Sequence, residues 1–266
     1  MNRDTNVAGI LARFPKVRPA LSPKEDAIHA TLMKRNRERL TLFTRVSDFL
    51  ESWMHRQASA DAQLPPRHHL LEIGAGTLNH IPYEPADVVY DVVEPSADMY
   101  CDKTGHDRVR AFYASTGDIS DAQRYDRIIT IAALEHMTDL PDNVAKAGLL
   151  LNDGGVFRAG IPSEGGLIWG LSWRLIGLDL FMRTGHNWAE HMHHEHVNTA
   201  SEIISVVGYF FDHVIVRRFP LQSHHLSFYA AIDASQPNKA RCSAYLEQHR
   251  LRQSSSGPEF GTEELS

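Results

Sequence analysis

A pair of glycines directly after an apolar run is the sequence feature that points most clearly to chemistry. The apolar segment 69–73 contains the acid Glu72, and Gly74, Ala75 and Gly76 follow it. A short apolar run that ends in a turn signal is typical of a parallel strand covered on both faces. Glycines after such a strand allow a tight turn, and the backbone can approach a ligand because no Cβ intervenes. The segment therefore predicts a ligand-binding turn at the end of a buried strand.

A second chemical segment, residues 125–136, combines a strand pattern with an acid and a histidine at its end. Tyr125 and Asp126 open the apolar run, and Glu135 and His136 follow it. Open α/β folds bind ligands at the carboxyl ends of their strands, so this pair is expected at the ligand-binding edge. For Glu135, a catalytic role and a structural role at a helix N-terminus fit the sequence equally well.

Taken in order, these segments resemble the motifs of the class I S-adenosylmethionine-dependent methyltransferases. The resemblance covers residues 68–162 and extends more loosely to residue 232. One departure is Leu78, which stands where a third glycine is frequent in the family. A dinucleotide-binding turn, the alternative, requires a glycine at the position of Asn79. The resemblance therefore favours a methyl donor over a nicotinamide or flavin cofactor.

The resemblance also implies a role for each residue of the cofactor site. Glu72 would lie near the methionyl end of S-adenosylmethionine, and Glu94 would accept hydrogen bonds from both ribose hydroxyls. A carboxylate suits the ribose because it accepts two donors at once. Asp118 would contact adenine or form an Asx turn, and Ala132 would leave room for the sulfonium. The expected cofactor-binding residues are Glu72, Gly74, Ala75, Gly76, Glu94, Asp118, Ile119 and Ala132.

Residues 186–196 form a histidine-rich segment with five histidines and two glutamates. Three interpretations stay open: a substrate pocket with one histidine as general base, a structural loop, and a bound metal. The segment lacks the His-Glu-x-x-His pattern of a zinc helix, so no metal ligands are assigned. His196 matches a late histidine of the family and is either a structural or a pocket residue. The candidate catalytic residues are His191, His193, His194, Glu135 and His136.

Composition limits the class of protein. The chain has 266 residues, 42% of them hydrophobic and 23% charged, which is typical of a soluble globular protein. A net charge of −6 argues against bulk binding of duplex nucleic acid, which requires a basic face. Two cysteines without a framework spacing indicate a reduced compartment. The first thirty residues carry no secretory pattern, so a cytoplasmic protein is expected.

The most apolar stretch, residues 166–182, is interrupted by Arg174 and Asp179. Its length is at the lower limit for spanning a bilayer. We therefore expect no transmembrane segment; the stretch is interpreted as a lid over the active site or as a surface for peripheral membrane contact.

The alternation of strand and helix signals predicts an α/β fold, a Rossmann-like doubly wound sheet of seven mostly parallel strands. Residues 1–64 are expected to form a polar lead-in and a helical cap, with a helix that begins near Ser22. The main domain is expected at residues 65–236, and residues 237–266 are expected to form a polar, flexible tail. A lid insertion after the fifth strand covers residues 163–198. Crossover helices are expected between the strands, and a further helix at 201–207. Strands are predicted at 68–73, 87–93, 109–113, 126–132, 155–161, 214–219 and 226–232.

The predicted function is methyl transfer from S-adenosylmethionine to an oxygen or nitrogen of a small-molecule acceptor, with S-adenosylhomocysteine as product. By family analogy alone, the acceptor is a sugar or a secondary metabolite. Two alternatives are a non-catalytic partner protein that binds the cofactor and a metal-dependent O-methyltransferase that uses the histidines. The sequence predicts no oligomeric state.

Overall fold

The computed structural model describes residues 3–28, 42–60, 64 and 68–255. The chain begins with α1 (Arg3–Leu11), and residues 23–28 are helical, as predicted for a helix that begins near Ser22. The helix α3 (Leu42–Ser59) then leads to the sheet. The part of the predicted helical cap that falls on residues 29–41 lies outside the described residues.

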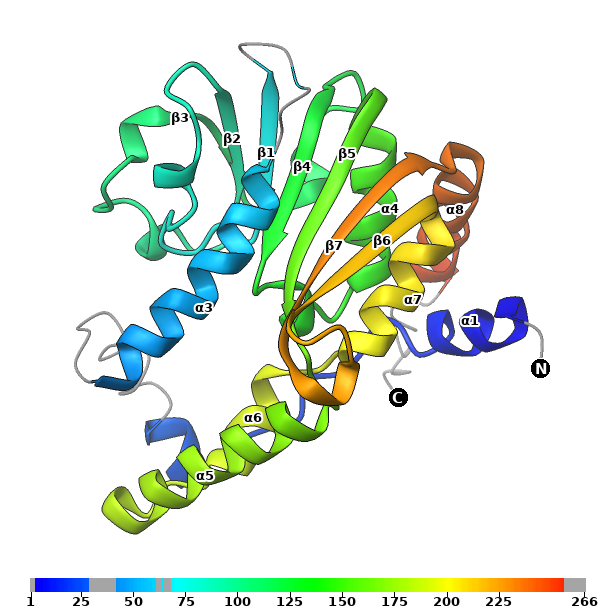
Figure 1. The fold of residues 1–266 in the computed structure, drawn as a ribbon. Helices are drawn as coiled ribbons and strands as arrows, with labels where there is room; N and C mark the ends of the chain where they lie inside the picture. Colours follow the sequence, from blue (N-terminus) through cyan, green and yellow to red (C-terminus); the bar gives the residue numbers. More distant parts are fainter. Residues whose placement is uncertain (1–2, 29–41, 61–63, 65–67, 256–266) are drawn as a thin grey trace, which may run out of the picture.

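A seven-stranded sheet forms the centre of the molecule, in the order β3-β2-β1-β4-β5-β7-β6 (Figure 1). All neighbouring strands pair in parallel except β7, which runs antiparallel to both β5 and β6. The predicted sheet of seven mostly parallel strands is thus confirmed. The strands are β1 (His69–Ile73), β2 (Val89–Val93), β3 (Val109–Tyr113), β4 (Tyr125–Ile131), β5 (Leu151–Pro162), β6 (Phe211–Pro220) and β7 (Ser227–Pro237).

The strand order reverses between β1 and β4, so the connections from these two strands leave the sheet in opposite directions. Crevices at such switch points are where open α/β sheets bind ligands, beyond the carboxyl ends of the strands. The glycine turn that begins at Gly74 and the turn after Ile131 therefore lie side by side at this edge.

Each face of the sheet has its own apolar core. In β5, Phe157 and Ala159 point into the larger core, which α4 (Leu140–Leu150) and α7 (Ala200–Phe210) cover. The alternate residue Gly160 faces α3, where a Cβ would lie 2.9 Å from the Cβ of Met54. Side chains of successive strand residues point to opposite faces, so α3 and the α4–α7 layer must cover opposite sides of the sheet (Figure 1).

The connections among the first four strands differ from the expectation. They contain short 3₁₀ turns, among them Ile81–Tyr83 after β1 and Ala97–Met99 after β2, in place of crossover helices. Prolines explain part of this difference, because Pro82, Pro85 and Pro95 interrupt these segments and proline disfavours a helix interior.

Both ends of the chain carry helices that the composition did not predict. The helix α1, in the expected lead-in, packs against α7, and Ile10 and Phe14 are buried in the larger core. The helix α8 (Lys239–Ser255) stands where a polar, flexible tail was expected, and its Cys242 is buried in the same core. The average polarity of these segments did not indicate either helix, because one or two buried side chains are enough to pack a polar segment against the core.

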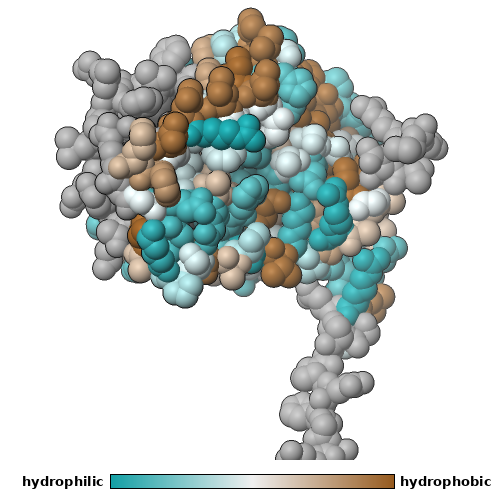
Figure 2. All heavy atoms as spheres, turned by 90° about the horizontal axis from the view of Figure 1, so that it is seen from below, coloured by the Kyte–Doolittle hydropathy of each residue, from teal (hydrophilic) through white to brown (hydrophobic). Residues whose placement is uncertain are grey.

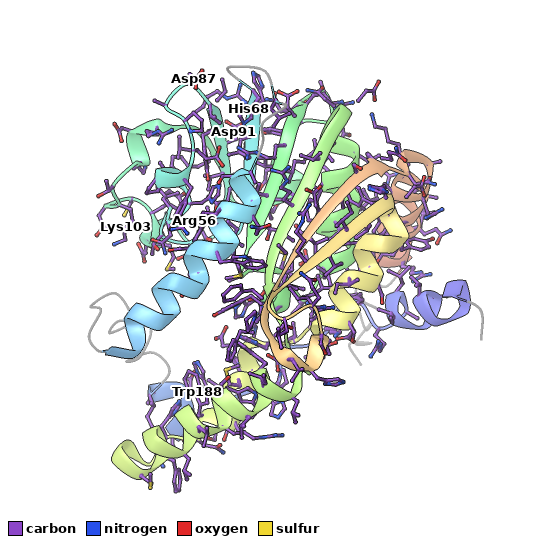
Figure 3. The ribbon with its side chains drawn as sticks, viewed as in Figure 1. Arg56, His68, Asp87, Asp91, Lys103 and Trp188 are labelled. Carbon is purple, nitrogen blue, oxygen red and sulfur yellow. The ribbon has the colours of Figure 1, made fainter. Side chains whose placement is uncertain are left out.

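The predicted insertion after β5 consists of two helices, α5 (Leu167–Thr184) and α6 (Trp188–Glu195). Figure 3 shows Trp188 where α6 meets α5, and a Cβ on Gly177 of α5 would lie 2.9 Å from its Cβ. Seen from below, apolar side chains gather in a band on the outer face (Figure 2). Its exposed apolar residues on α5 are Leu167, Leu171, Leu175, Leu178, Phe181 and Met182.

None of the helices in the described part of the chain combines the length and the hydrophobicity of a membrane span. The predicted lid and peripheral membrane contact of α5 stay predictions.

Candidate functional site

The glycine turn after β1 requires backbone conformations that disfavour side chains. Gly74 has φ +76° and Gly76 has φ +50°. A Cβ at Gly74 would lie only 2.5 Å from the Cβ of Ala133, in the turn after β4. The Gly74 N–H donates to the carbonyl of Val93 at 2.8 Å, which fixes the turn to the end of β2. Glycine at position 74 is therefore required both by backbone conformation and by the close approach of two turns.

Glu94 lies directly beside this turn, at the end of β2. Its Oε2 accepts the Gly76 N–H at 2.9 Å, and its Oε1 accepts the Ser96 N–H at 3.1 Å. A carboxylate has about four lone-pair positions, so each oxygen retains capacity for a second donor. The arrangement can accept a vicinal diol next to the backbone of the glycine turn.

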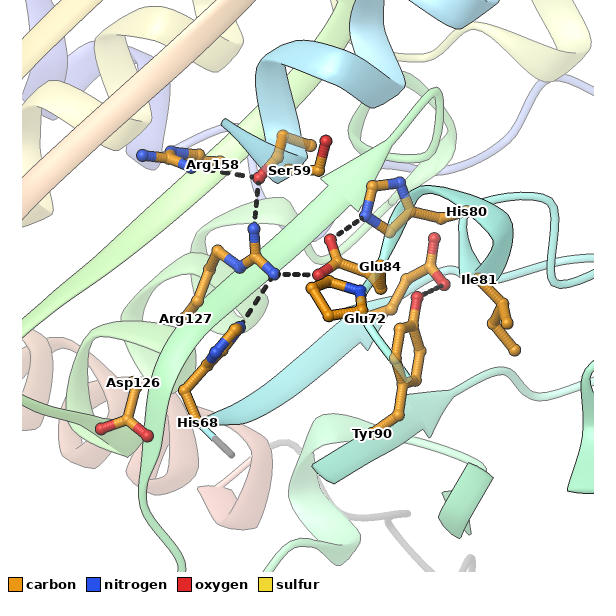
Figure 4. A network of polar contacts seen from close by, with 12 residues as sticks. Ser59, His68, Glu72, His80, Ile81, Glu84, Tyr90, Asp126, Arg127 and Arg158 are labelled. Carbon is orange, nitrogen blue, oxygen red and sulfur yellow. Dashed lines mark hydrogen bonds and ion pairs between the residues drawn. The ribbon is translucent and has the colours of Figure 1, made fainter. Parts of the chain in front are cut away.

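Glu72 lies beneath the turn rather than at its surface. Its side chain is buried, and its Oε2 accepts the hydroxyl hydrogen of Tyr90 at 2.5 Å (Figure 4). The pKa of Glu72 is raised overall. Burial raises it by more than the charge of the nearby His80 and the hydrogen bond from Tyr90 lower it. In this structure the hydrogen bond from Tyr90 to Glu72 links the side chains of β2 and β1.

Next to Glu72 lies a buried network around Arg127, on the face of the sheet that α3 covers. Arg127 pairs with Glu84 and donates to the carbonyl of Ala58 at 3.0 Å, near the end of α3. Glu84 also contacts the ring of His80 at 2.6 Å. Burial raises the pKa of Glu84, but the hydrogen bond to His80 and the charge of Arg127 outweigh burial and lower it. The network connects α3, β4 and the segment after the glycine turn (Figure 4).

The remaining predicted cofactor residues lie in the turns at the same edge. Asp118 is exposed, and its Oδ2 accepts the Ser115 N–H at 2.8 Å, so its side chain closes a capping box at the 3₁₀ turn Thr116–Asp118. Its contact with adenine stays a prediction. Its neighbour Ile119 is buried. Ala132 has φ +49°, which is uncommon for a residue with a Cβ, and its N–H donates to Gly160 at 2.8 Å.

A cluster of acids and imidazoles follows the β4 turn. The Nε2 of His136 lies 3.9 Å from Oε1 of Glu135, and the rings of His136 and His196 meet edge to face at 4.9 Å. His196 Nδ1 contacts Oε2 of Glu164 at 3.0 Å, and Trp169 Nε1–H donates to the same oxygen at 2.5 Å. We call Glu135, His136, Glu164 and His196 the edge cluster.

Burial and pairing set the charges of the edge cluster. Burial raises the pKa of Glu135. Burial alone would lower the pKa of His136, but the hydrogen bond to Glu195 and the charge of Glu135 raise it. For Glu164, burial is outweighed by its hydrogen bond to His196, and its pKa is lowered. A proton acceptor and charged partners thus lie within one site.

Backbone contacts hold the edge cluster together. The N–H groups of Val197 and Asn198 donate to the carbonyl of Glu135 at 2.9 and 3.1 Å. The Asn198 amide also donates to the carbonyls of Leu134 and Met137, at 2.8 and 2.6 Å. The segment that carries His196 is therefore fixed against the turn that carries Glu135.

The N-terminal segment closes over the same region. Arg18 donates to the carbonyls of His136 and His194, both at 2.7 Å, and Lys16 donates to the carbonyl of Val197 at 2.7 Å. Further along, Lys24 donates to the carbonyl of Gly185 at 2.9 Å. The predicted lead-in thus forms part of the wall of the site.

The three histidines proposed as bases take different positions on α6. His191 is buried and stacks on Trp188, with ring centroids 4.7 Å apart. His194 contacts the carbonyl of Pro19 through Nδ1 at 2.7 Å, so it holds the N-terminal segment. His193 is exposed. Of the predicted catalytic residues, the structure brings together Glu135 and His136, and His196 joins them.

Sequence reasoning missed two members of this region. Glu164 follows β5 and Tyr229 lies on β7, where its ring meets Trp169 at 5.8 Å. Burial raises the pKa of Tyr229, as do the charges of Glu51 and Glu135. Neither residue stands in a motif; their position at the carboxyl end of β5 and at the start of the antiparallel β7 was the available signal.

The similarity of this chain to known proteins is found in its fold and not in its sequence. No family model matches the sequence, and a search of curated proteins also found no match. Among solved structures, the plantazolicin methyltransferase in complex with S-adenosylhomocysteine has a TM-score of 0.55 at 13% identity, covering 88% of this chain and 99% of that chain.

Two further solved structures have a TM-score of 0.50. One is a possible histamine N-methyltransferase from Thermotoga maritima, 14% identical, covering 73% of this chain and 96% of that chain. The other is a possible exported protein from Bordetella parapertussis, 10% identical, covering 89% of this chain and 80% of that chain. From its strand order and these likenesses, the chain has the fold of the class I S-adenosylmethionine-dependent methyltransferases.

Proposed function

We propose that this protein is an S-adenosylmethionine-dependent methyltransferase that acts on an oxygen or nitrogen of a small-molecule acceptor. The observation that carries the proposal is the placement of Glu94. Its carboxylate accepts the N–H of Gly76, in the turn after β1 next to the switch point of the sheet. Solved neighbours of this fold were crystallised with the cofactor or its product, which supports the same cofactor here.

In this proposal the glycine turn and the strand ends hold the cofactor. Glu94 accepts the ribose hydroxyls, the backbone of Gly74, Ala75 and Gly76 approaches the methionyl part, and Glu72 stabilises the turn from below. Asp118 and Ile119 flank the adenine, and Ala132 lies beside the sulfonium. The methyl group of a sulfonium is already activated, so alignment of nucleophile, methyl carbon and sulfur supplies much of the catalysis.

The edge cluster forms the acceptor side of the site in this proposal. The segment that carries Glu135 and His136 lies close to the glycine turn, since a Cβ at Gly74 would lie 3.7 Å from Cε of Met137. Glu135 and His136 hold the acceptor and take up its proton when the acceptor is a hydroxyl. The oxygen or nitrogen forms a bond to the methyl carbon, the carbon–sulfur bond breaks, and its electron pair returns to sulfur.

A small acceptor fits the charge of the chain better than a nucleic acid, because the net charge is −6. The second candidate function is a non-catalytic partner protein that binds the cofactor; the intact Glu94 site would serve it equally. A methyl-transfer assay separates the two candidates, because only an enzyme converts S-adenosylmethionine to S-adenosylhomocysteine with an acceptor present.

Thermal unfolding in the presence of S-adenosylhomocysteine and, separately, NAD tests the cofactor class. A ligand at about 100 times its Kd stabilises the native state by about 2.7 kcal/mol. S-adenosylhomocysteine should raise the Tm and NAD should not. Labelled S-adenosylmethionine and a panel of sugars, phenols and amines would then identify the acceptor. A Tm that rises with NAD alone would contradict the proposal.

A further inference from the structure

Two imidazoles and one carboxylate of the edge cluster converge on one point. Glu135, His136 and His196 each contribute one atom of a kind that binds metals, and these atoms lie within 4.8 Å of one another. Imidazole nitrogens and a carboxylate oxygen together suit first-row transition metals, whereas Mg²⁺ and Ca²⁺ prefer oxygen ligands alone. The sequence segment 186–196 contributes only one of these three ligands, which explains why its own spacing indicated no metal site.

Each imidazole is held by a glutamate at Nδ1. In His136 this nitrogen lies 3.2 Å from Oε2 of Glu195 and 2.9 Å from its carbonyl oxygen. In His196 it lies 3.0 Å from Oε2 of Glu164. A hydrogen on Nδ1 that is donated to a glutamate fixes the tautomer in which Nε2 carries a free lone pair. Histidines that bind metals are generally oriented by such a carboxylate or carbonyl partner.

The carboxylate of the triangle has an unused oxygen. The Glu135 side chain is 2% exposed, and its Oε2 has no hydrogen-bond partner among the described residues. Leaving a buried carboxylate oxygen unpaired is costly, so a native structure requires a reason for it. A cation bound between Glu135 and the two imidazoles would supply that partner.

We propose that Glu135, His136 and His196 bind a divalent first-row transition metal such as Zn²⁺ at the carboxyl edge of β4. Ligand atoms about 2.1 Å from a tetrahedral ion lie about 3.4 Å apart, so the triangle, whose atoms lie within 4.8 Å of one another, contracts by up to about 1.4 Å on binding. The His136 side chain is 34% exposed, which leaves a path to solvent. Three protein ligands leave a coordination position open.

The catalytic consequence rests on the proposed function. An acceptor hydroxyl in the open position would lose its proton to solvent more readily, because a bound cation stabilises the oxyanion. The resulting oxygen anion then forms its bond to the methyl carbon of S-adenosylmethionine as the carbon–sulfur bond breaks toward sulfur. In this state the imidazoles serve as ligands rather than bases.

Calorimetric titration of the chelator-treated full chain with Zn²⁺ tests the metal site without an acceptor. The variants Glu135→Gln and His196→Gln each remove one ligand with little change in shape, and circular dichroism checks that both fold. His213→Gln, an exposed histidine on β6, is the control. We expect one ion per chain, binding at least tenfold weaker in both ligand variants, and unchanged binding in the control.

Equal Zn²⁺ affinity in all four proteins, or no binding by the wild type, would overturn the metal site. Titration of the same metal-free proteins with S-adenosylhomocysteine distinguishes this failure from a failure of the proposed function. Cofactor binding without metal binding would refute only the metal site, whereas metal binding without cofactor binding would refute only the proposed function.

Discussion

The buried ion pair between Arg127 and Glu84 gives a quantitative test of the packing beneath the glycine turn. Their side chains are 1% and 0% exposed, and the pair bonds to His80 and to the carbonyl of Ala58. Arg127→Met keeps an apolar side chain of similar length in the same space. It leaves the Glu84 carboxylate without its cation in a site that water does not reach.

The size of the loss follows from the protonation of Glu84. The variant can remove the uncompensated charge by protonating this carboxyl, whose ordinary pKa is 4.5. Protonation at pH 7 costs about 3.4 kcal/mol, because each pKa unit is worth about 1.36 kcal/mol. The result agrees with the 3–5 kcal/mol, roughly, that removal of one partner from a buried pair costs. At pH 5 the cost of protonating Glu84 falls to about 0.8 kcal/mol.

The sign is fixed by the protons that each state binds. Folded Arg127→Met holds a proton on Glu84 that its unfolded chain releases above pH 4.5, so lower pH favours the folded variant. Urea unfolding of wild type and variant at pH 7 and pH 5 measures both differences. Arg250→Met, whose partner Glu247 is exposed, should change stability by less than about 1 kcal/mol.

A second substitution at Glu84 completes the test. Arg127→Met/Glu84→Gln removes the uncompensated charge, and the double variant should be more stable at pH 7 than Arg127→Met alone. A loss below about 1 kcal/mol in the single variant at pH 7, or a loss that does not shrink at pH 5, would show that an uncompensated Glu84 charge is not the cause.

Three further predictions concern the turn, its neighbourhood and the acceptor side. Gly74→Ala should weaken S-adenosylhomocysteine binding at least tenfold in calorimetry and lower the Tm more than Gly154→Ala, which has a similar φ of +79° but nothing within 4 Å; equal losses would contradict the close approach to Ala133. Burial and the neighbouring His80 lower the pKa of His55 to about 3, so its unfolded form binds the extra proton below pH 6.5 and stability should fall by about 2 kcal/mol from pH 7.5 to pH 5; urea unfolding of His55→Gln should show a smaller fall. His136→Gln should lower kcat by about 10²–10⁴-fold while S-adenosylmethionine affinity stays unchanged, and a labelled-methyl assay in which kcat is unaffected would exclude it from proton transfer or acceptor binding.

The sheet could be predicted from sequence because its strands carry two signals at once. The apolar runs that end at Ile73 and Val93 are followed directly by turn residues, so period and punctuation agree. The glycine turn was predictable for the same reason. The 3₁₀ turns Ile81–Tyr83 and Ala97–Met99 were harder to predict. A segment long enough for a helix can form 3₁₀ turns instead when prolines interrupt it.

The acceptor side was only partly predictable, because its residues come from separate segments. Glu135 and His136 stand in a motif, but Glu164 and His196 join them only through the fold. Local density drew attention to His191 and His194, which the structure uses to pack α6 and to hold the N-terminal segment. Counting ligand-type residues along the chain does not reveal which of them share a face.

Calorimetric titration of the wild type and of Glu94→Ala with S-adenosylmethionine and S-adenosylhomocysteine tests whether this protein binds the methyl donor through Glu94. We expect the wild type to bind both ligands with a stoichiometry of one, and Glu94→Ala to bind at least tenfold more weakly because the ribose loses its acceptor. A variant that keeps its Tm in the absence of ligand would show that the loss is local to the site. No binding by the folded wild type, or equal binding by both proteins, would contradict a methyl-donor site at Glu94.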